Sequence, residues 1–138
     1  MMEYYCTITE DSGLYGVEFP DLPSVITVGS TREEALAMAS DALNSALESD
    51  VSRGLSMPEP SAKVGADLYP IEVAPHIVIA WQIRRFRGER SQSEIAARLG
   101  LTYQAYQRLE NPMKGNPTVK TLERVARALG KRLEVRIA

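Results

Sequence analysis

The sequence lacks most of the residues that catalytic, metal and membrane sites need. It has one cysteine and one histidine, so an intramolecular disulfide is excluded and zinc-ligand or Cys–His spacing is absent. A cytoplasmic protein is the default expectation for such a chain. The longest runs of apolar residues, such as residues 77–81, contain five residues. A membrane-spanning helix needs about 20. The N-terminal residues also lack the basic segment followed by an apolar segment that marks a signal peptide. We therefore expect neither a signal peptide nor a membrane protein.

Charge is present but is divided unevenly along the chain. The 138 residues hold 16 basic and 18 acidic side chains, a formal charge of −2. Residues 1–75 carry 3 basic and 13 acidic side chains, a net of −10, and residues 76–138 carry 13 basic and 5 acidic ones, a net of +8. Such asymmetry suggests two units with differently charged partners, the basic one a candidate for nucleic acid. We place the units at residues 1–74 and 75–138, each small enough that oligomerisation often helps stability.

The acidic half predicts an α+β unit. Its three first strands are expected over residues 4–9, 15–19 and 24–28. Thr31 and Glu34 have the spacing of a capping box, so a helix should begin there and end near Gly54. Residues 66–73 can return as a strand, and Pro70 confines that strand to an edge of the sheet. The predicted order is therefore β-β-β-α-β.

The basic half predicts a bundle of helices with a terminal strand. One helix begins at Pro75, and three more are expected over residues 92–99, 103–110 and 119–129. Arginines 84, 85 and 87 lie at the end of the first helix, where we expect solvated charges that complement the helix dipole. Residues 132–137 alternate apolar and charged side chains, which is the period of a strand.

The segment Ser91–Asn111 indicates a helix-turn-helix. Gly100 can supply the sharp turn, Ala96 is small enough for two helices to approach, and Thr102 can cap the second helix. Together with the loop and helix that follow, this stretch resembles the phage-repressor (XRE/Cro) family over roughly residues 83–130. In that family the second helix of the motif reads bases in the major groove of DNA.

The resemblance implies two sets of DNA-contacting residues. The base-contacting set is Tyr103, Gln104, Gln107 and Arg108. The phosphate-contacting set is Gln92, Asn111, Lys114 and Asn116. Glutamine can pair with adenine and arginine with guanine through two hydrogen bonds each, whereas the role of Tyr103 stays open.

The acidic half resembles the N-terminal domain of HicB-type antitoxins. The likeness rests on residues 16–23, 29–36 and 39–43, and it covers residues 4–73. It implies a truncated ribonuclease-H-like fold, which matches the order of elements predicted above. Where the family often has Gly-Cys after its second proline, this chain has Ser24-Val25.

Catalysis is not expected despite that fold. Two-metal hydrolysis needs converging carboxylates, one of them in the middle of the first strand, and that strand has none there. Cys6 has no plausible histidine partner and fits a small core residue better than a nucleophile. We therefore expect no enzyme activity, no metal and no cofactor.

The resemblance instead implies a protein partner, a small basic HicA-type toxin that cleaves mRNA. Acidic side chains could cover the positive surface that such a toxin offers to RNA. The candidate contacts are Glu18, Asp21, Asp41 and Glu48. The alternative interpretation is a stand-alone transcription regulator whose N-terminal unit senses a ligand or oligomerises.

The alternating tail also suggests how the chain could assemble. Leu133, Val135 and Ile137 could pair with a second copy, giving a homodimer that places two recognition helices about one turn apart on a palindromic operator. Alternatively the tail could close its own domain. Further association through the N-terminal units would make a tetramer, which the sequence leaves open.

Overall fold

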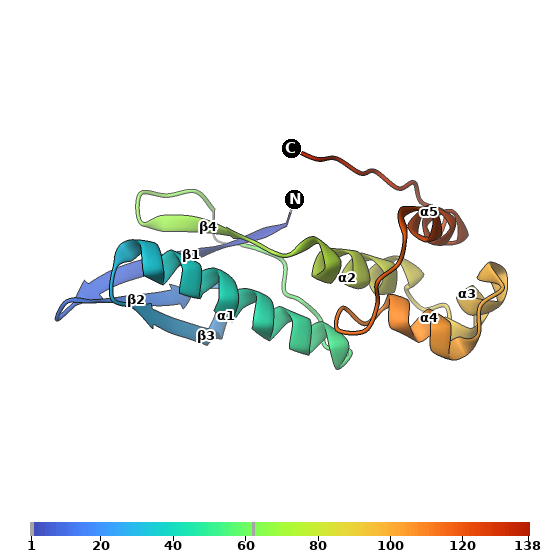
Figure 1. Ribbon diagram of the computed structural model, residues 1–138, viewed down its shortest axis with the longest axis horizontal. Helices are drawn as coiled ribbons and strands as arrows, with labels where there is room; N and C mark the ends of the chain where they lie inside the picture. Colours follow the sequence, from blue (N-terminus) through green and yellow to red (C-terminus); the bar gives the residue numbers. More distant parts are fainter. Residues whose placement is uncertain (1, 62) are drawn as a thin grey trace.

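A four-stranded antiparallel sheet and one long helix form the first unit. The computed structural model describes residues 2–61 and 63–138. The strands are β1 (Glu3–Asp11), β2 (Leu14–Phe19), β3 (Leu22–Gly29) and β4 (Leu68–Glu72), in the order β3-β2-β1-β4. Helix α1 (Arg32–Ser52) follows β3 and lies across one face of the sheet (Figure 1). The predicted order β-β-β-α-β and the edge position of the last strand are confirmed.

The core of this unit lies between the sheet and α1. Alternate strand residues such as Tyr4, Cys6 and Val17 are fully buried against the apolar side of α1. That side repeats every three or four residues, which is the period of a helix that packs on one face. A Cβ atom on Gly29 would lie 2.4 Å from the backbone nitrogen of Ala35, so glycine allows β3 and the start of α1 to approach closely.

Helix α2 (Pro75–Arg87) connects the two units without a flexible linker. Ile77 and Ala80, in its first half, belong to the core of the sheet unit, whereas Ile83 belongs to the core of the helical unit. Asn44 of α1 fixes the start of α2, because its Oδ1 atom accepts from the backbone nitrogen of Ala74 at 2.7 Å. The two units therefore share one helix.

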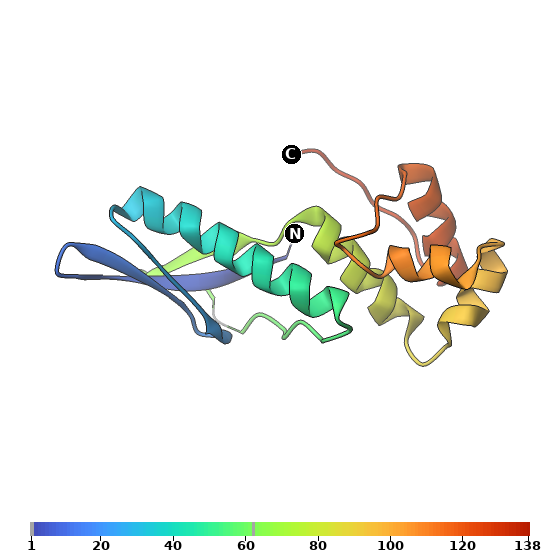
Figure 2. The ribbon, with the colours of Figure 1, turned by 60° about the horizontal axis from the view of Figure 1, so that its bottom comes forward.

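The second unit contains three further helices, α3 (Gln92–Leu99), α4 (Tyr103–Leu109) and α5 (Val119–Ala128). They gather at the end of the molecule opposite the sheet, as Figures 1 and 2 show. Gly100 has φ of 67° and ends α3 in the left-handed conformation, which glycine adopts without steric cost. The predicted turn of the helix-turn-helix is thus present, and the hydroxyl of Thr102 caps α4 as expected.

Two expectations for the basic half are corrected. The predicted terminal strand is absent, since residues 131–138 form no helix or strand. A strand needs a neighbouring backbone to pair with, and in the single chain the tail extends away with Ile137 98% exposed. The three arginines of α2 are not all solvated helix-end charges either. Arg87 is mostly buried in an ion pair with Glu110, and Arg85 lies 2.9 Å from Glu59 of the other unit.

Candidate nucleic-acid interface

Helix α4 exposes the side chains that the sequence predicts to read bases. Tyr106 and Leu109 are buried in the core of the helical unit. The intervening positions point outward because a helix repeats every 3.6 residues. Tyr103 is 44% exposed, and Gln104, Gln107 and Arg108 are exposed as well. The cap at Thr102, whose hydroxyl accepts from the backbone nitrogen of Ala105 at 3.1 Å, fixes where this helix begins.

Six of the eight predicted DNA-contacting residues line one cavity of about 630 Å³. These are Gln92, Gln104, Gln107, Arg108, Asn111 and Lys114. Arg84, Arg87 and Glu110 complete its charged lining, so the cavity carries a net positive charge. Residues Val51, Ser52 and Gly54, at the end of α1, form the opposite wall. The other two predicted contacts, Tyr103 and Asn116, lie outside this lining.

A buried ion pair organises this surface. Arg87 and Glu110 are 17% and 4% exposed, and two guanidinium nitrogens of Arg87 donate to the Glu110 carboxylate at 2.7 and 3.1 Å. The hydrogen bond to Glu110 raises the pKa of Arg87. Gln92 also donates to Glu110, at 3.1 Å, and its own Oε1 atom accepts from Gln107 at 3.5 Å. Glu110 thus orients a predicted phosphate-contacting residue that lies beside a base-contacting one.

Glu110 is a site residue that the sequence did not reveal. Residues 76–138 contain five acidic and thirteen basic side chains, and in such a sequence Glu110 resembles an ordinary surface charge. The available signal was its position just after the recognition helix. A carboxylate is almost never fully buried unless it is paired, and here the pairing partner is a residue 23 positions away. The tertiary fold brings the two side chains together by placing the end of α2 beside the end of α4.

Arg84 is a second cation on the cavity wall. Its guanidinium lies 4.9 Å from the centre of the Trp81 ring, and burial lowers its pKa. Its Nη1 atom is buried without a hydrogen-bond partner among the described residues. A buried unpaired guanidinium nitrogen is costly, so this side of the cavity favours an anion.

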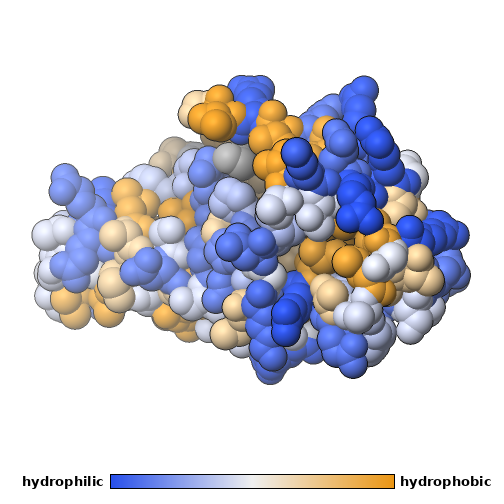
Figure 3. All heavy atoms as spheres, turned by 45° about the vertical axis from the view of Figure 1, so that its right-hand side comes forward, coloured by the Kyte–Doolittle hydropathy of each residue, from blue (hydrophilic) through white to orange (hydrophobic). Residues whose placement is uncertain are grey.

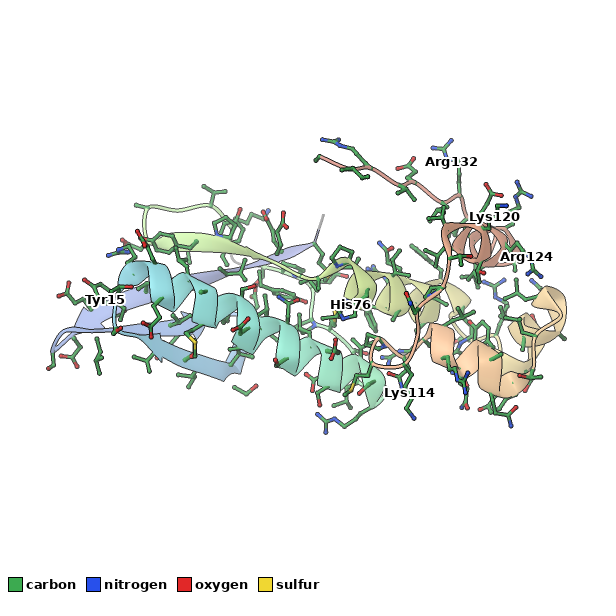
Figure 4. The ribbon with its side chains drawn as sticks, viewed as in Figure 1. Tyr15, His76, Lys114, Lys120, Arg124 and Arg132 are labelled. Atoms are coloured by element: carbon green, nitrogen blue, oxygen red, sulfur yellow. The ribbon has the colours of Figure 1, made fainter. Side chains whose placement is uncertain are left out.

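The loop after α4 places Lys114 beside the recognition helix. The Asn111 side chain accepts a hydrogen bond from the backbone nitrogen of Met113 at 3.0 Å. The backbone carbonyl of Asn111 accepts another from the backbone nitrogen of Gly115 at 2.8 Å. A Cβ atom on Gly115 would lie 2.3 Å from the Arg108 carbonyl oxygen, so the loop needs glycine there. Figure 4 shows Lys114 under the loop at the left-hand end of α4, whereas Lys120 and Arg124 lie at α5, above α4. The basic residues therefore face more than one direction.

The four acidic candidates for toxin contact are not brought together. Glu18 is exposed on the face of the sheet that α1 leaves open, and Asp41 is exposed on α1. The Asp21 carboxylate accepts from the backbone nitrogen of Ser61 at 2.8 Å and from its hydroxyl. Glu48 lies 2.5 Å from the His76 Nε2 atom at the start of α2. Two of the four therefore bind within the chain.

The tail borders a second, more apolar cavity of about 390 Å³ between α2 and α5. Leu133 lines this cavity together with residues such as Phe86 and Leu129. Val135 and Ile137, the other two predicted dimer contacts, are 64% and 98% exposed. Figure 3, with this side of the molecule forward, shows hydrophobic surface exposed among hydrophilic side chains.

Metal-binding and membrane-spanning features are both missing from residues 2–61 and 63–138. These residues contain no group of three or more His, Cys, Asp or Glu side chains arranged to hold a metal ion. Burial raises the pKa of the Cys6 thiol, which disfavours the reactive thiolate. None of the described helices is both long and apolar enough to cross a membrane.

Comparison with known proteins gives consistent matches to both units. Residues 3–75 match the family described as HicB-like antitoxin of bacterial toxin-antitoxin systems, and residues 82–135 match a helix-turn-helix family. "Antitoxin HicB 2" of Photorhabdus laumondii is 34% identical over 97% of this chain and 95% of its own length. "Antitoxin HicB" of Escherichia coli is 32% identical over 97% of this chain and 98% of its own. The crystal structure of the Burkholderia pseudomallei antitoxin HicB superposes with a TM-score of 0.48 at 23% identity, covering 72% of this chain and 94% of that one.

Proposed function

The chain belongs to the HicB-like antitoxin family and carries a helix-turn-helix domain, and from this premise we propose that it has two separate activities. Residues 1–74 neutralise a HicA-type toxin, a small basic ribonuclease that cleaves mRNA. Residues 75–138 repress the chain's own operon by binding operator DNA. The truncated ribonuclease-H-like fold of the first unit is part of the same proposal, supported by the sheet order and the helix on one face.

The observation that carries the DNA-binding part is the positive cavity that gathers six predicted contact residues. Helix α4 enters the major groove, where Gln104 and Arg108 bond the edges of adenine and guanine. Gln92, Asn111, Lys114 and Asn116 contact phosphates beside it, and such contacts set the position of the helix on the duplex. The Arg87–Glu110 pair holds Gln92 in place before DNA arrives, so less ordering is needed on binding.

Repression of a palindromic operator requires two copies of the chain. We place the dimer contact at the tail, where Leu133, Val135 and Ile137 alternate with charged residues. The exposure of Val135 and Ile137 supports this, because an extended segment with unpaired backbone groups can pair with a copy of itself. A variant with Ile137→Asp should then sediment as a monomer and bind the operator more weakly. Assembly to a tetramer is compatible with this contact.

Charge supports the toxin-binding part. The first unit has a net charge of −10, and complementary charge speeds encounter and selects partners. A toxin that handles RNA must present a positive surface, so an acidic antitoxin can occupy the surface that RNA would use. No metal or cofactor takes part in this mechanism, because neutralisation is binding without chemistry.

Co-expression is the experiment that tests this function. Where an adjoining reading frame encodes a small basic protein, the chain is produced together with that protein, and affinity capture is carried out at low salt. Capture of that protein as a stoichiometric complex supports the antitoxin proposal. Purification of the chain alone beside such a neighbour contradicts it and favours the alternative of a stand-alone transcription regulator.

A further inference from the structure

The face of the sheet that lies away from α1 has no covering element among the described residues. We define this open face by Glu3, Thr7, Glu18, Ile26, Val28 and Glu72. The strand registers place these side chains on the same side, since Thr7 pairs with Glu18, Glu18 with Ile26, and Glu3 with Glu72. In Figures 1 and 2 helix α1 lies on the other side of the sheet. An uncovered sheet face is usually polar, so its composition is informative.

The open face combines exposed apolar side chains with three carboxylates, of which that of Glu3 accepts a hydrogen bond from the Tyr5 hydroxyl at 3.4 Å. Ile26 and Val28 are 66% and 48% exposed. As the structure bounds them, β1 to β4 contain no lysine or arginine. Among the described residues, Glu18 and Glu72 form no salt bridge. The exposed apolar side chains are unfavourable on a surface that meets only water. Beside them, the negative charge favours a basic protein partner.

The open face continues onto an unpaired edge of the sheet. Strand β3 pairs with β2 on one side only, so its other backbone edge is free of any described strand. Proteins commonly protect such edges with charged side chains or proline. Here Pro23 stands near one end, whereas Ile26 and Val28 follow without a charge between them. A partner can therefore contact this edge through backbone and apolar side chains together.

The outer side of α1 offers a weaker surface, although it is acidic too. Glu48 is held by His76, Asp50 by Arg53 at 2.8 Å, and Glu34 accepts from the Ser30 hydroxyl at 2.7 Å. Three of the five carboxylates of α1 are thus engaged within the chain and have less to gain from a basic partner. Of the large apolar residues of α1, Met38 is the exposed one, at 39%.

We propose that the open face of the sheet, with the edge of β3, is the surface that binds the basic toxin. This inference rests on the proposed antitoxin function and names its binding surface. The negative charge repels nucleic acid. It also disfavours a second copy bound through the same face, because like charges placed opposite each other are destabilising. A basic protein with an apolar contact satisfies both the carboxylates and the exposed side chains.

Matched charge reversals test the location. The open-face variant is Glu18→Lys with Glu72→Lys, and the control with the same change in charge is Glu33→Lys with Asp50→Lys on α1. The probe is the basic protein from the adjoining reading frame, and binding is measured by titration calorimetry. We expect the open-face variant to bind it about 100-fold more weakly and the control to bind within about threefold of the unaltered chain. Equal binding by the open-face variant, or a larger loss in the control, overturns the inference.

Further measurements distinguish a wrongly assigned surface from a wrongly assigned function. If the unaltered chain fails to bind the probe, the proposed function fails, independently of which face is used. Ile26→Thr keeps a β-branched residue in β3 while removing apolar surface, so we expect about tenfold weaker binding with an unchanged melting temperature. A change in the oligomeric state of the open-face variant without toxin, seen by sedimentation, would assign the face to a second copy and overturn the inference.

Discussion

The two units of this chain differ in where they place their charges relative to their cores. In the sheet unit the carboxylates lie at the surface, and the core between the sheet and α1 is apolar. In the helical unit one carboxylate, that of Glu110, is buried and orients the side chains around the recognition helix. This difference agrees with the two proposed activities, because a broad acidic surface can attract a basic partner through its summed charge. Reading bases instead requires a few side chains held in defined positions.

The largest effect is expected from breaking the buried pair of the helical unit. Glu110→Ala leaves the Arg87 guanidinium buried without its partner, which typically costs about 3–5 kcal/mol of unfolding free energy. Urea unfolding followed by circular dichroism measures this change. Operator affinity should fall too, since Gln92 loses its anchor.

The matched control for this variant is Glu94→Ala. Glu94 and Arg98 form an ion pair at 3.1 Å in which both side chains are about half exposed, and such surface pairs contribute less than about 1 kcal/mol. A loss of stability as small for Glu110→Ala as for Glu94→Ala would show that the buried pair does not organise this unit.

The next largest effect tests whether the two units have separate activities. Gln104→Ala combined with Arg108→Ala removes two of the proposed base contacts, and a contact of this kind is worth about 1–3 kcal/mol of discrimination. We expect loss of operator binding in a gel-shift assay with promoter DNA of the operon, while neutralisation of the toxin stays intact. Lys120→Ala, on α5 away from Lys114 (Figure 4), is the control and should bind DNA nearly as well. Loss of both activities in a folded double variant would contradict separate functions.

A smaller effect distinguishes the two buried tyrosines, one in each core. The Tyr4 hydroxyl donates to the Pro58 carbonyl, whereas that of Tyr106 is buried near the Glu110 carboxylate without a hydrogen bond of regular geometry among the described residues. Tyr4→Phe should therefore lower the free energy of unfolding by about 1 kcal/mol, and Tyr106→Phe should lower it by less. Thermal unfolding of the two variants provides the comparison, and equal losses would contradict it.

Alkaline pH provides a related, gradual test. Burial raises the pKa of Tyr4 to about 12, and it raises the pKa of Tyr106 as well. A raised pKa in the folded state means that the neutral form is favoured by folding. Its stabilising contribution is complete below the unfolded pKa of about 10 and is lost as the pH rises toward the folded value. Stability should thus fall as the pH rises from about 10 to about 12, and less in Tyr4→Phe, as chemical unfolding at each pH would show.

Local sequence patterns predicted most of the individual elements. Alternation identified the strands, the spacing of apolar residues identified the helices, and capping residues such as Thr31 and Thr102 located their starts. These features depend on neighbours in the chain, so the sequence expresses them directly. The tail was the exception. Its strand-like alternation is real, but a strand depends on a partner backbone that the single chain does not provide.

The sequence predicted one part of the candidate site better than another, because only one part depends on neighbouring residues in the chain. The positions exposed on α4 follow from helical periodicity once Tyr106 and Leu109 are assigned to the core. The acidic set followed from composition alone, and the structure separates its members or engages them within the chain, as with Asp21 and Ser61. Composition predicts the sign of the net charge on a surface. It does not predict which charged side chains form no contact within the chain.

By itself, then, the sequence determined the separation of charge, the order of the elements and the presence of a helix-turn-helix, because each depends on residues close together in the chain. Tertiary structure decided the rest. It placed α2 in both cores, paired Arg87 with Glu110 and left one face of the sheet open. Those outcomes depend on packing between segments that are distant in the sequence. This packing determines how buried each charge is, and therefore how much the charge contributes to the free energy of unfolding.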